Sequence, residues 1–130
     1  MQFNNPELDN ACETGIKPAC AACGFTADIV SQNHIGDITD KIISEIKSSR
    51  FVVADFTYNN FGVYYEAGYA KGLGIPVIKT CCKKWFEKTN LDGSRINRLH
   101  FDIEHDNLLL WETAEDLKEK LENRIRAVIP

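Results

Sequence analysis

Residues 51–78 constrain the fold more than any other part of this chain, because they read as two buried strands joined by one helix. The run Phe51-Val52-Val53-Ala54 is apolar and rich in β-branched residues, which is typical of a parallel strand buried on both faces. A helix is predicted from about Gly62 to Gly72, and Gly74-Ile75-Pro76 then turns the chain into a second buried strand at Val77-Ile78. Parallel strands need such a crossover, so this segment predicts a βαβ unit.

The residues before this unit predict two helices with a short strand between them. A helix is expected over residues 6–23, ending at Gly24, with Pro18 marking either a kink or a break between two short helices. Residues 27–30 form a short strand candidate. Asp37 is expected to cap the next helix, in which Ile38, Ile42 and Ile46 share one face.

The residues after the unit predict one more strand and one more helix. Residues 82–98 form a charged excursion with a predicted turn at residues 90–93, and residues 108–111 are the last strand candidate. Thr113 is expected to cap a helix through about Val128, with Asp116 at the spacing of a capping box. One face of that helix carries apolar residues, namely Leu117, Leu121, Ile125 and Val128.

This order of elements predicts a single α/β domain over residues 1–130, a flavodoxin-like three-layer sandwich with a mainly parallel sheet. Folds of this kind normally open with a strand, whereas this chain opens with a helix. We therefore expect residues 1–3 to be the stub of a first strand that is short or missing, as in a chain truncated at its start.

Charge and hydropathy exclude several classes of function. The formal net charge is −4 at pH 7 and the pI is near 5.3, so no basic surface is available for nucleic acid. No long apolar run and no basic-then-apolar leader occur, so neither a membrane span nor a signal peptide is predicted. The expected location is the cytoplasm.

Neither the cysteines nor the histidines predict a cofactor or a metal ion. Cys20 and Cys23 fall at the end of a helix, whereas a thioredoxin-like motif needs them at a helix start. Cys81 and Cys82 are adjacent and would face opposite sides of a strand, which does not suit zinc. We expect buried structural thiols, and the three histidines, His34, His100 and His105, lack metal-ligand spacing and are expected to be solvated.

The candidate site lies where the first buried strand ends, since ligands of open α/β sheets bind beyond the carboxyl ends of the strands. Asp55 is the first polar residue after that strand, and Asn60 is a natural helix cap beside free backbone N–H groups. Helical spacing predicts that Asn60, Val63 and Glu66 border one pocket, with Asp55 reaching in from the strand end. The alternatives are structural: Glu66 stabilised by the helix dipole, and Asp55 as a turn or cap residue.

Two carboxyl groups in such a pocket suit glycosidic chemistry. Glu66 can attack an anomeric carbon or stabilise an oxocarbenium-like transition state, and Asp55 can protonate the leaving group. Of the adjacent Tyr64 and Tyr65, one is expected in the core and the other beside the pocket. A flavodoxin-type redox role fits poorly, because residues 55–60 lack the Ser/Thr/Gly cradle for an FMN phosphate.

The sequence resembles the nucleoside 2-deoxyribosyltransferase-like superfamily, which is related in fold to TIR-type nucleotide hydrolases. The resemblance covers nearly the whole chain. It is carried by Phe51-Val52-Val53-Ala54-Asp55-Phe56-Thr57, by Asn60-Phe61-Gly62-Val63-Tyr64-Tyr65-Glu66-Ala67-Gly68-Tyr69-Ala70 and by Gly74-Ile75-Pro76-Val77-Ile78, with Gly15-Ile16-Lys17-Pro18 upstream and His100-Phe101-Asp102 and Leu110-Trp111-Glu112 downstream.

The resemblance implies that Glu66 is the nucleophile and that Asp55 helps to orient the base or sugar. It implies a nucleoside or nucleotide ligand and further binding residues, namely Thr57, Asn60, Gly62, Tyr64, Asp102 and Asn107. Asn60 stands where the family has an aspartate. The resemblance also implies a homo-oligomer in which residues 100–107 contribute to a neighbouring site.

Three functions remain open at this point. The first is an enzyme that cleaves or transfers an N-glycosidic bond through Glu66. The second is a non-catalytic nucleotide sensor, which the amide of Asn60 favours over the enzyme. The third is a TIR-like signalling domain that assembles on binding its ligand.

Overall fold

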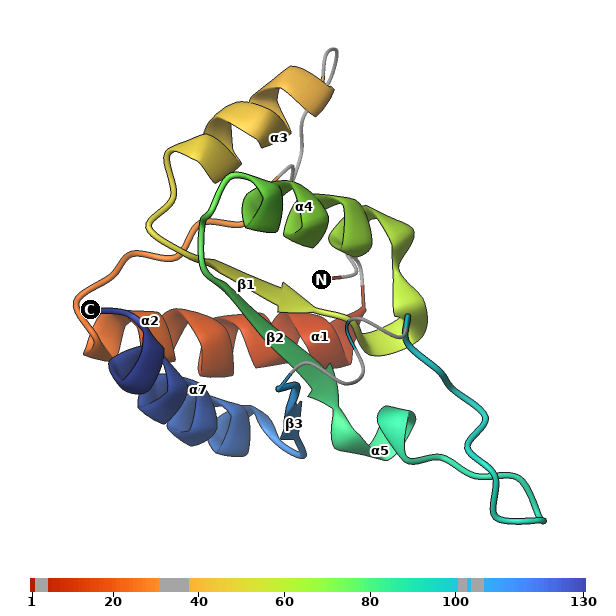
Figure 1. Ribbon diagram of the computed structural model, residues 1–130. Coiled ribbons are helices and arrows are strands. Elements are labelled where there is room, and N and C mark those ends of the chain that lie inside the picture. The colour runs from red at the N-terminus through yellow and green to blue at the C-terminus, as the bar shows by residue number, and fades with distance from the viewer. Residues whose placement is uncertain (2–4, 31–37, 101–102, 104–106) are drawn as a thin grey trace.

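Three parallel strands form one open sheet in the order β1-β2-β3 (Figure 1). They are β1 (Val52–Asp55), β2 (Val77–Cys82) and β3 (Leu109–Trp111). Val52 pairs with Val77, and Thr80 pairs with Leu109, so the carboxyl ends of all three strands meet at one edge of the sheet. This computed structural model describes residues 1, 5–30, 38–100, 103 and 107–130.

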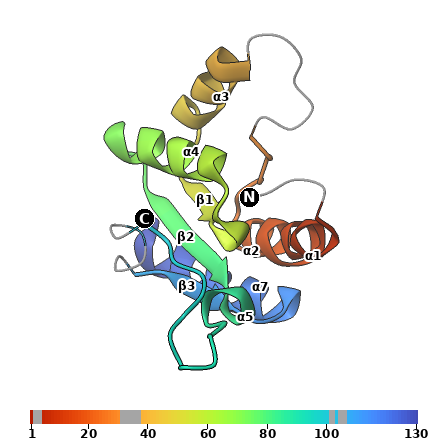
Figure 2. The ribbon, with the colours of Figure 1, turned by 90° about the vertical axis from the view of Figure 1, so that its right-hand side faces the viewer.

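Helices cover both faces of the sheet and make three layers, as Figure 2 shows. On one face α4 packs against β1 and β2, and α3 packs against α4. On the other face α7 packs against β3 and against the N-terminal helical segment. The helical elements are α1 (Pro6–Asn10), η1 (Ala11–Ile16), α2 (Lys17–Ala22), α3 (Ile38–Lys47), η2 (Thr57–Asn59), α4 (Phe61–Gly72), α5 (Lys83–Phe86) and α7 (Ala114–Val128). The predicted α/β sandwich is therefore confirmed.

Two hydrophobic cores lie on the two faces of the sheet. The larger contains Leu8, Ile78 and Trp111 with the inner faces of α1, η1, α2 and α7. The smaller lies under α4 and contains Phe56 and Val63. Adjacent strand residues alternate between the two, so Cys82 belongs to the larger core and Cys81 to the smaller, as predicted for a strand.

The first helix runs from Pro6 through Ala22 and contains a π-helical segment, η1, just before Pro18. The Lys17 N–H donates to the carbonyl of Cys12, five residues back, so the wider turn accommodates the proline without ending the helix. The predicted irregularity at Pro18 takes this form. Gly24 follows at φ 86°, and the Phe25 N–H donates to the Cys20 carbonyl, which closes the helix as expected.

The strand predicted at residues 27–30 is wrong, because these residues have no regular structure. An extended segment becomes a strand only when a neighbour supplies hydrogen bonds, and the sheet ends at β1. Within the described residues no strand precedes β1. The expected strand stub includes residues 2 and 3, and the expected cap Asp37 precedes α3; these three residues lie outside the described ones.

The βαβ unit forms as predicted, with shifted boundaries. β1 begins and ends one residue later than expected, so that Asp55 is its last residue. β2 continues to Cys82, well beyond the predicted Ile78, because Lys79 to Cys82 face packed layers on both sides and are all buried.

The elements after β2 also agree with the predictions from the sequence. The predicted turn carries a Gly93 N–H to Asn90 carbonyl bond of 3.1 Å, and β3 lacks only Leu108 of the predicted strand. The Thr113 hydroxyl accepts from the Asp116 N–H at 3.0 Å, and the Asp116 carboxylate accepts from the Glu112 N–H at 2.8 Å. This is a capping box shifted by one residue at its acidic end. Val128, unlike the three other predicted apolar residues of this face, is exposed.

Gly15 gives a test of the packing between η1 and α7. A methyl group added there would lie 2.9 Å from the Ala114 carbonyl oxygen and 3.1 Å from a Leu117 methyl carbon, whereas one added at Gly68 of α4 would meet nothing within 4 Å. We expect Gly15→Ala to lower the free energy of unfolding by about 1–3 kcal/mol through overpacking. Gly68→Ala, the matched control, should raise it by about 0.5–1 kcal/mol through helix propensity. Urea denaturation of dilute protein measures both, and equal effects would contradict the close contact.

Candidate functional site

Asp55 joins all three strands where they end. The residue is fully buried, at 0% exposure. Its Oδ1 accepts from the Thr57 N–H at 3.0 Å. Its Oδ2 accepts from the Thr80 hydroxyl of β2 at 2.6 Å and from the Trp111 Nε1–H of β3 at 2.8 Å. A buried carboxylate needs such donors to replace water, and both oxygens of Asp55 have them.

The side chain of Asp55 lies on the face of the sheet that α1, η1 and α7 cover. Its partner Trp111 belongs to the larger core. Thr80, its partner on β2, lies on the same face of that strand as Ile78 and Cys82, which also belong to the larger core. To protonate a leaving group, Asp55 would have to lose one of these bonds and gain access to a ligand. The geometry therefore supports a positioning role for Asp55, close to the structural alternative considered from the sequence.

Thr57 is likewise buried and engaged with the backbone. Its hydroxyl accepts from the Cys82 N–H at 2.8 Å and so ties the start of η2 to the end of β2. No solvent-exposed surface of Thr57 faces the expected ligand site.

The turn between β1 and α4 contains two consecutive residues in the left-handed region, Tyr58 at φ 66° and Asn59 at φ 58°. Such a conformation is costly for tyrosine and is held here by side-chain contacts. The Asn59 amide donates to the Arg98 carbonyl at 3.1 Å, and the Tyr58 ring meets Trp85 edge-on at 6.1 Å.

Tyr64 fastens the loop before β3 to α4. Its hydroxyl donates to Asn59 Oδ1 at 2.7 Å and accepts from the His100 N–H at 3.1 Å. Its ring packs against Phe56 at 4.8 Å and against the His100 ring at 4.7 Å. Of the two adjacent tyrosines, Tyr64 is therefore the one packed on the core, while Tyr65 lies on the outer surface.

Asn60 caps α4 as predicted, since its Oδ1 accepts from the Gly62 N–H at 2.8 Å. Gly62 is exposed, and a Cβ there would lie 3.1 Å from the same Asn60 oxygen. These two residues shape the start of α4 at the carboxyl edge of the sheet.

Glu66 is a half-buried carboxyl one and a half turns into α4. Burial raises its pKa, the amino group of Met1 opposes that shift, and Glu45 of α3 adds to it as a like charge. The Met1 amino group in turn has its pKa lowered by burial, against the attraction of Asp55 and Glu66. Both carboxyls therefore lie close enough to Met1 to act on its charge.

Val63 does not border the predicted pocket together with Asn60 and Glu66. Val63 is buried under α4 in the smaller core, because this part of the helix faces the sheet. Each helical residue is turned by 100° from the one before it, so Asn60 and Glu66 lie on opposite flanks of the buried face of α4. Glu66 faces α3 and Met1, while Asn60 lies toward the turn after β1.

Of the two remaining predicted binding residues, the structure describes only Asn107, which is not brought to this corner. Asn107 precedes β3, where its carbonyl accepts from the Arg124 guanidinium of α7 at 2.9 Å. Asp102 lies outside the described residues, as do His34 and His105. His100, predicted to be solvated, is exposed but stacks edge-on against Tyr64.

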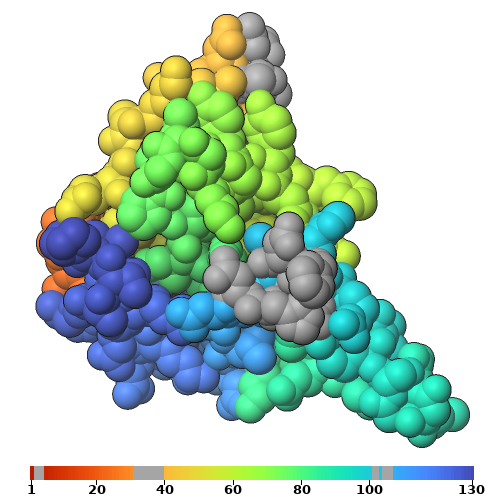
Figure 3. All heavy atoms as spheres, in the orientation of Figure 1, coloured from red at the N-terminus to blue at the C-terminus, as the bar shows by residue number. Residues whose placement is uncertain are grey.

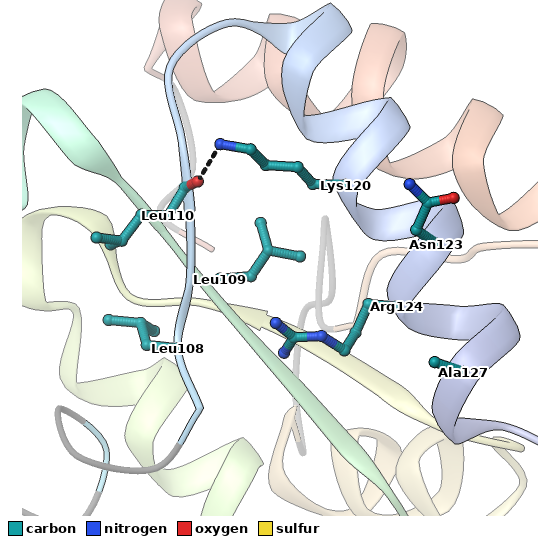
Figure 4. A pocket seen from close by; sticks show the side chains of 7 residues that line it. All are labelled: Leu108, Leu109, Leu110, Lys120, Asn123, Arg124 and Ala127. Carbon is teal, nitrogen blue, oxygen red and sulfur yellow. Dashed lines mark hydrogen bonds between the residues drawn. The ribbon is translucent and has the colours of Figure 1, made fainter.

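Two shallow hollows lie elsewhere on the molecule. One, of about 430 Å³, runs between the outer edge of β3 and α7 (Figure 4). Lys120 donates to the Leu110 carbonyl at 3.0 Å there, so its charge is already bound to the strand edge. The other, of about 300 Å³, lies at the opposite end of the sheet, between the end of α4 and β2. Neither is lined by Asp55 or Glu66, so the chemistry of the carboxyls and not the size of a hollow defines the candidate site.

The five cysteines are free, and all but the half-buried Cys23 are buried. Burial raises the pKa of Cys20 to about 11, which keeps it a thiol at neutral pH. In the part of the chain that the structure describes, no three His, Cys, Asp or Glu side chains gather closely enough to hold a metal ion. No helix there is long and apolar enough to cross a membrane.

Four further residues bind the predicted site residues: Thr80 and Asn59 were not expected from the sequence, whereas Trp111 and His100 lie in motifs that carry the family resemblance. Thr80 and Trp111 bind Asp55, while Asn59 and His100 bind Tyr64. Thr80 and Trp111 could have been found once the strand register is known, since Thr80 pairs with Asp55 and Trp111 is the last residue of the next strand. Nothing local marks Asn59.

Comparisons with protein families, with curated proteins and with solved structures gave no match for this chain. The class of the protein therefore remains α/β with an open parallel sheet.

Asp55→Asn tests the junction of the three strands. The amide keeps the size of the carboxyl, but its NH₂ group would face the Trp111 Nε1–H or the Thr57 N–H, donor against donor. We expect a loss of about 2–4 kcal/mol in the free energy of unfolding, from broken bonds to a charged acceptor and an unsatisfied donor.

The control compares the double variant Asp55→Asn/Trp111→Phe with the two single variants, with the free energy of unfolding measured by urea denaturation. Because both variants affect one contact, their combined loss should be smaller than the sum of the single losses by at least about 0.5 kcal/mol. Fully additive losses would show that the two residues act independently.

Proposed function

We propose that this chain cleaves or transfers an N-glycosidic bond of a nucleoside or nucleotide, with Glu66 as the nucleophile. The observation that carries the proposal is the half-buried Glu66 carboxyl, whose pKa is raised by burial, on the helix that follows the carboxyl end of β1. Perturbed carboxyls at such positions are functional-site candidates. The motif around Glu66, which resembles that of nucleoside 2-deoxyribosyltransferases, supports the same residue.

In the proposed reaction the Glu66 carboxylate attacks the anomeric carbon of the sugar. The bond from that carbon to the base nitrogen breaks, and the base leaves with the electron pair and takes a proton from water. The resulting glycosyl ester of Glu66 is then attacked at the same carbon by water or by a second base, which releases the carboxylate. Partial desolvation of Glu66 favours the attack, because a carboxylate with fewer water contacts is more reactive.

The carboxyl edge of the sheet, from which α4 departs, supplies further groups of the kinds that bind nucleotides. Tyr58 is exposed at the strand end and presents an aromatic ring on which a nucleobase can stack. The N-terminus of α4, which begins at Phe61, would favour an anionic substituent of a nucleotide through the helix dipole. Asp55 enters as a positioning residue, because it fixes the strand ends from which this turn departs.

A non-catalytic nucleotide sensor is the second candidate. Two observations favour it: an amide, Asn60, stands where the resembling family has a carboxyl, and both oxygens of Asp55 are already bound. This candidate predicts saturable binding of a nucleotide that stays intact. A TIR-like domain that assembles on binding its ligand is the remaining alternative. For the enzyme we propose a cytoplasmic location and a homo-oligomeric state.

Release of free base tests the proposal directly. Purified protein is incubated with nucleosides, nucleoside monophosphates and NAD, and the products are separated by chromatography. We expect base release that falls by roughly 10²-fold or more in Glu66→Gln, which keeps the shape but removes the nucleophile. Glu119→Gln, the same change on the exposed face of α7, is the matched control and should keep full activity. Release that persists in Glu66→Gln would rule out the nucleophile, and an inert wild type that still binds nucleotide would favour the sensor.

The pH dependence gives an independent check of Glu66. Only the ionised carboxyl attacks, so activity should fall on acidification at a pH above the ordinary glutamate pKa of about 4.3, because burial raises the pKa of Glu66. Glu45→Gln removes a like charge, so the pKa of Glu66 and the acid limb should both move to lower pH. NMR titration of the Glu66 carboxyl measures this shift even without activity. A shift to higher pH in Glu45→Gln would contradict the described arrangement.

A further inference from the structure

The hollow between the outer edge of β3 and α7 is the larger of the two, with a volume of about 430 Å³ (Figure 4). Small-molecule sites in proteins span about 300–1,000 Å³, so this hollow has the size of a ligand site. Both of its walls lie at the surface in Figure 3, where the blue atoms of α7 lie beside the lighter blue atoms of β3. A ligand can therefore enter from solvent without a change of the fold.

One stripe of α7 and one edge of the sheet line this hollow. Lys120, Asn123, Arg124 and Ala127 come from α7, at the i, i+3, i+4 and i+7 spacing that places side chains on one face of a helix. Residues 108–110, all leucine, form the opposite wall. The hydrocarbon stems of the lysine and the arginine lie along the hollow and add to its apolar lining (Figure 4). The hollow is therefore mostly apolar and carries a few polar groups, as ligand sites usually do.

Arg124 gives the hollow its charge. Its half-buried guanidinium extends from α7 toward β3 (Figure 4) and donates one N–H to the Asn107 carbonyl at 2.9 Å. Lys120, by contrast, is paired with the Asp116 carboxylate at 3.1 Å. Among the described residues, no carboxylate lies within ion-pair distance of Arg124, and its other N–H groups make no hydrogen bond. A guanidinium in this state suits an anion, because a carboxylate accepts two parallel N–H bonds from it.

We propose that this hollow binds an aliphatic carboxylate, which is a small monoanion with an apolar body. The carboxylate accepts two N–H bonds from Arg124, and the hydrocarbon chain lies along the leucines of β3 and Ala127. One guanidinium supplies one positive charge, which a monoanion balances and a phosphate group, with a charge of about −1.5 to −2 at pH 7, does not. This inference does not depend on the proposed chemistry, because Glu66 does not line the hollow.

An extended peptide strand fits the same edge less well than a small carboxylate. A strand added to β3 would need the backbone carbonyls of that edge as acceptors for its own N–H groups. Lys120 already donates to the Leu110 carbonyl at 3.0 Å, and Arg124 donates to the Asn107 carbonyl. An aliphatic carboxylate has no N–H group and needs neither carbonyl, so these two bonds can remain when it binds.

NMR titration of the isotope-labelled protein with octanoate tests the proposal. We expect saturable shifts between about 10 µM and about 5 mM octanoate, largest at the Arg124 side chain and at the backbone of residues 108–110. Acetate has the carboxylate without the chain, and octanol has the chain without the charge, so each should bind at least about tenfold more weakly. A wild type that does not bind octanoate in this range, or that binds acetate or octanol as tightly, would overturn the proposal.

Two variants of α7 separate the role of the guanidinium from that of the hollow. Arg124→Gln removes the charge and should weaken octanoate binding at least about tenfold. Ala127→Phe keeps Arg124 but fills the hollow from an exposed position that the fold tolerates, and should weaken binding by a similar factor. Arg126→Gln, on the same helix but outside the hollow, is the matched control and should bind octanoate as the wild type does. Unchanged binding in Arg124→Gln or in Ala127→Phe would assign octanoate to another surface and overturn the proposal.

Discussion

The arrangement of the strand ends depends on the buried carboxylate of Asp55. A charge in the protein interior is tolerated only when it is well supplied with hydrogen-bond donors, and here they come from η2, β2 and β3. Thr80 and Trp111 fix the register at which the three strands end, and the bond to the Thr57 N–H fixes where the chain leaves β1. The turn that carries Asn60, and the start of α4 with Glu66 behind it, take their positions from this junction.

The core of the fold could be predicted because its signals are local. An apolar run, a helix of the right length and a glycine turn define the βαβ unit whatever else the chain does, and Thr113 marks the start of α7 by its own side chain. The failure at residues 27–30 has the opposite cause. Their pattern suits a strand, but a strand exists only beside a partner, and β1 ends the described sheet. The sequence pattern shows that a segment suits a strand, but it does not show whether a partner strand lies beside it.

The candidate site was predicted less well, because facing directions depend on single-residue shifts. The edge of the sheet at which Asp55 lies was foreseeable. The face of the sheet on which its side chain lies was not foreseeable. β1 starts at Val52, one residue later than predicted, so Asp55 belongs to the strand and points to the layer opposite α4. In the same way, spacing grouped Val63 with Asn60 and Glu66, but could not tell which stripe of α4 faces the sheet. The contact of Tyr64 with His100 could not be predicted from the sequence, since the two residues are 36 positions apart.

The outer edge of β3 has a consequence for solubility. Three consecutive leucines, residues 108–110, followed by a tryptophan make the kind of stretch that stacks into intermolecular sheets when its backbone is accessible. Lys120 and Arg124 hold the carbonyls of Leu110 and Asn107, so acceptors that an incoming strand would use are already occupied by cations. Two side chains of α7 thus act as gatekeepers for a segment of another element, and the last helix protects the chain from aggregation as well as filling its core.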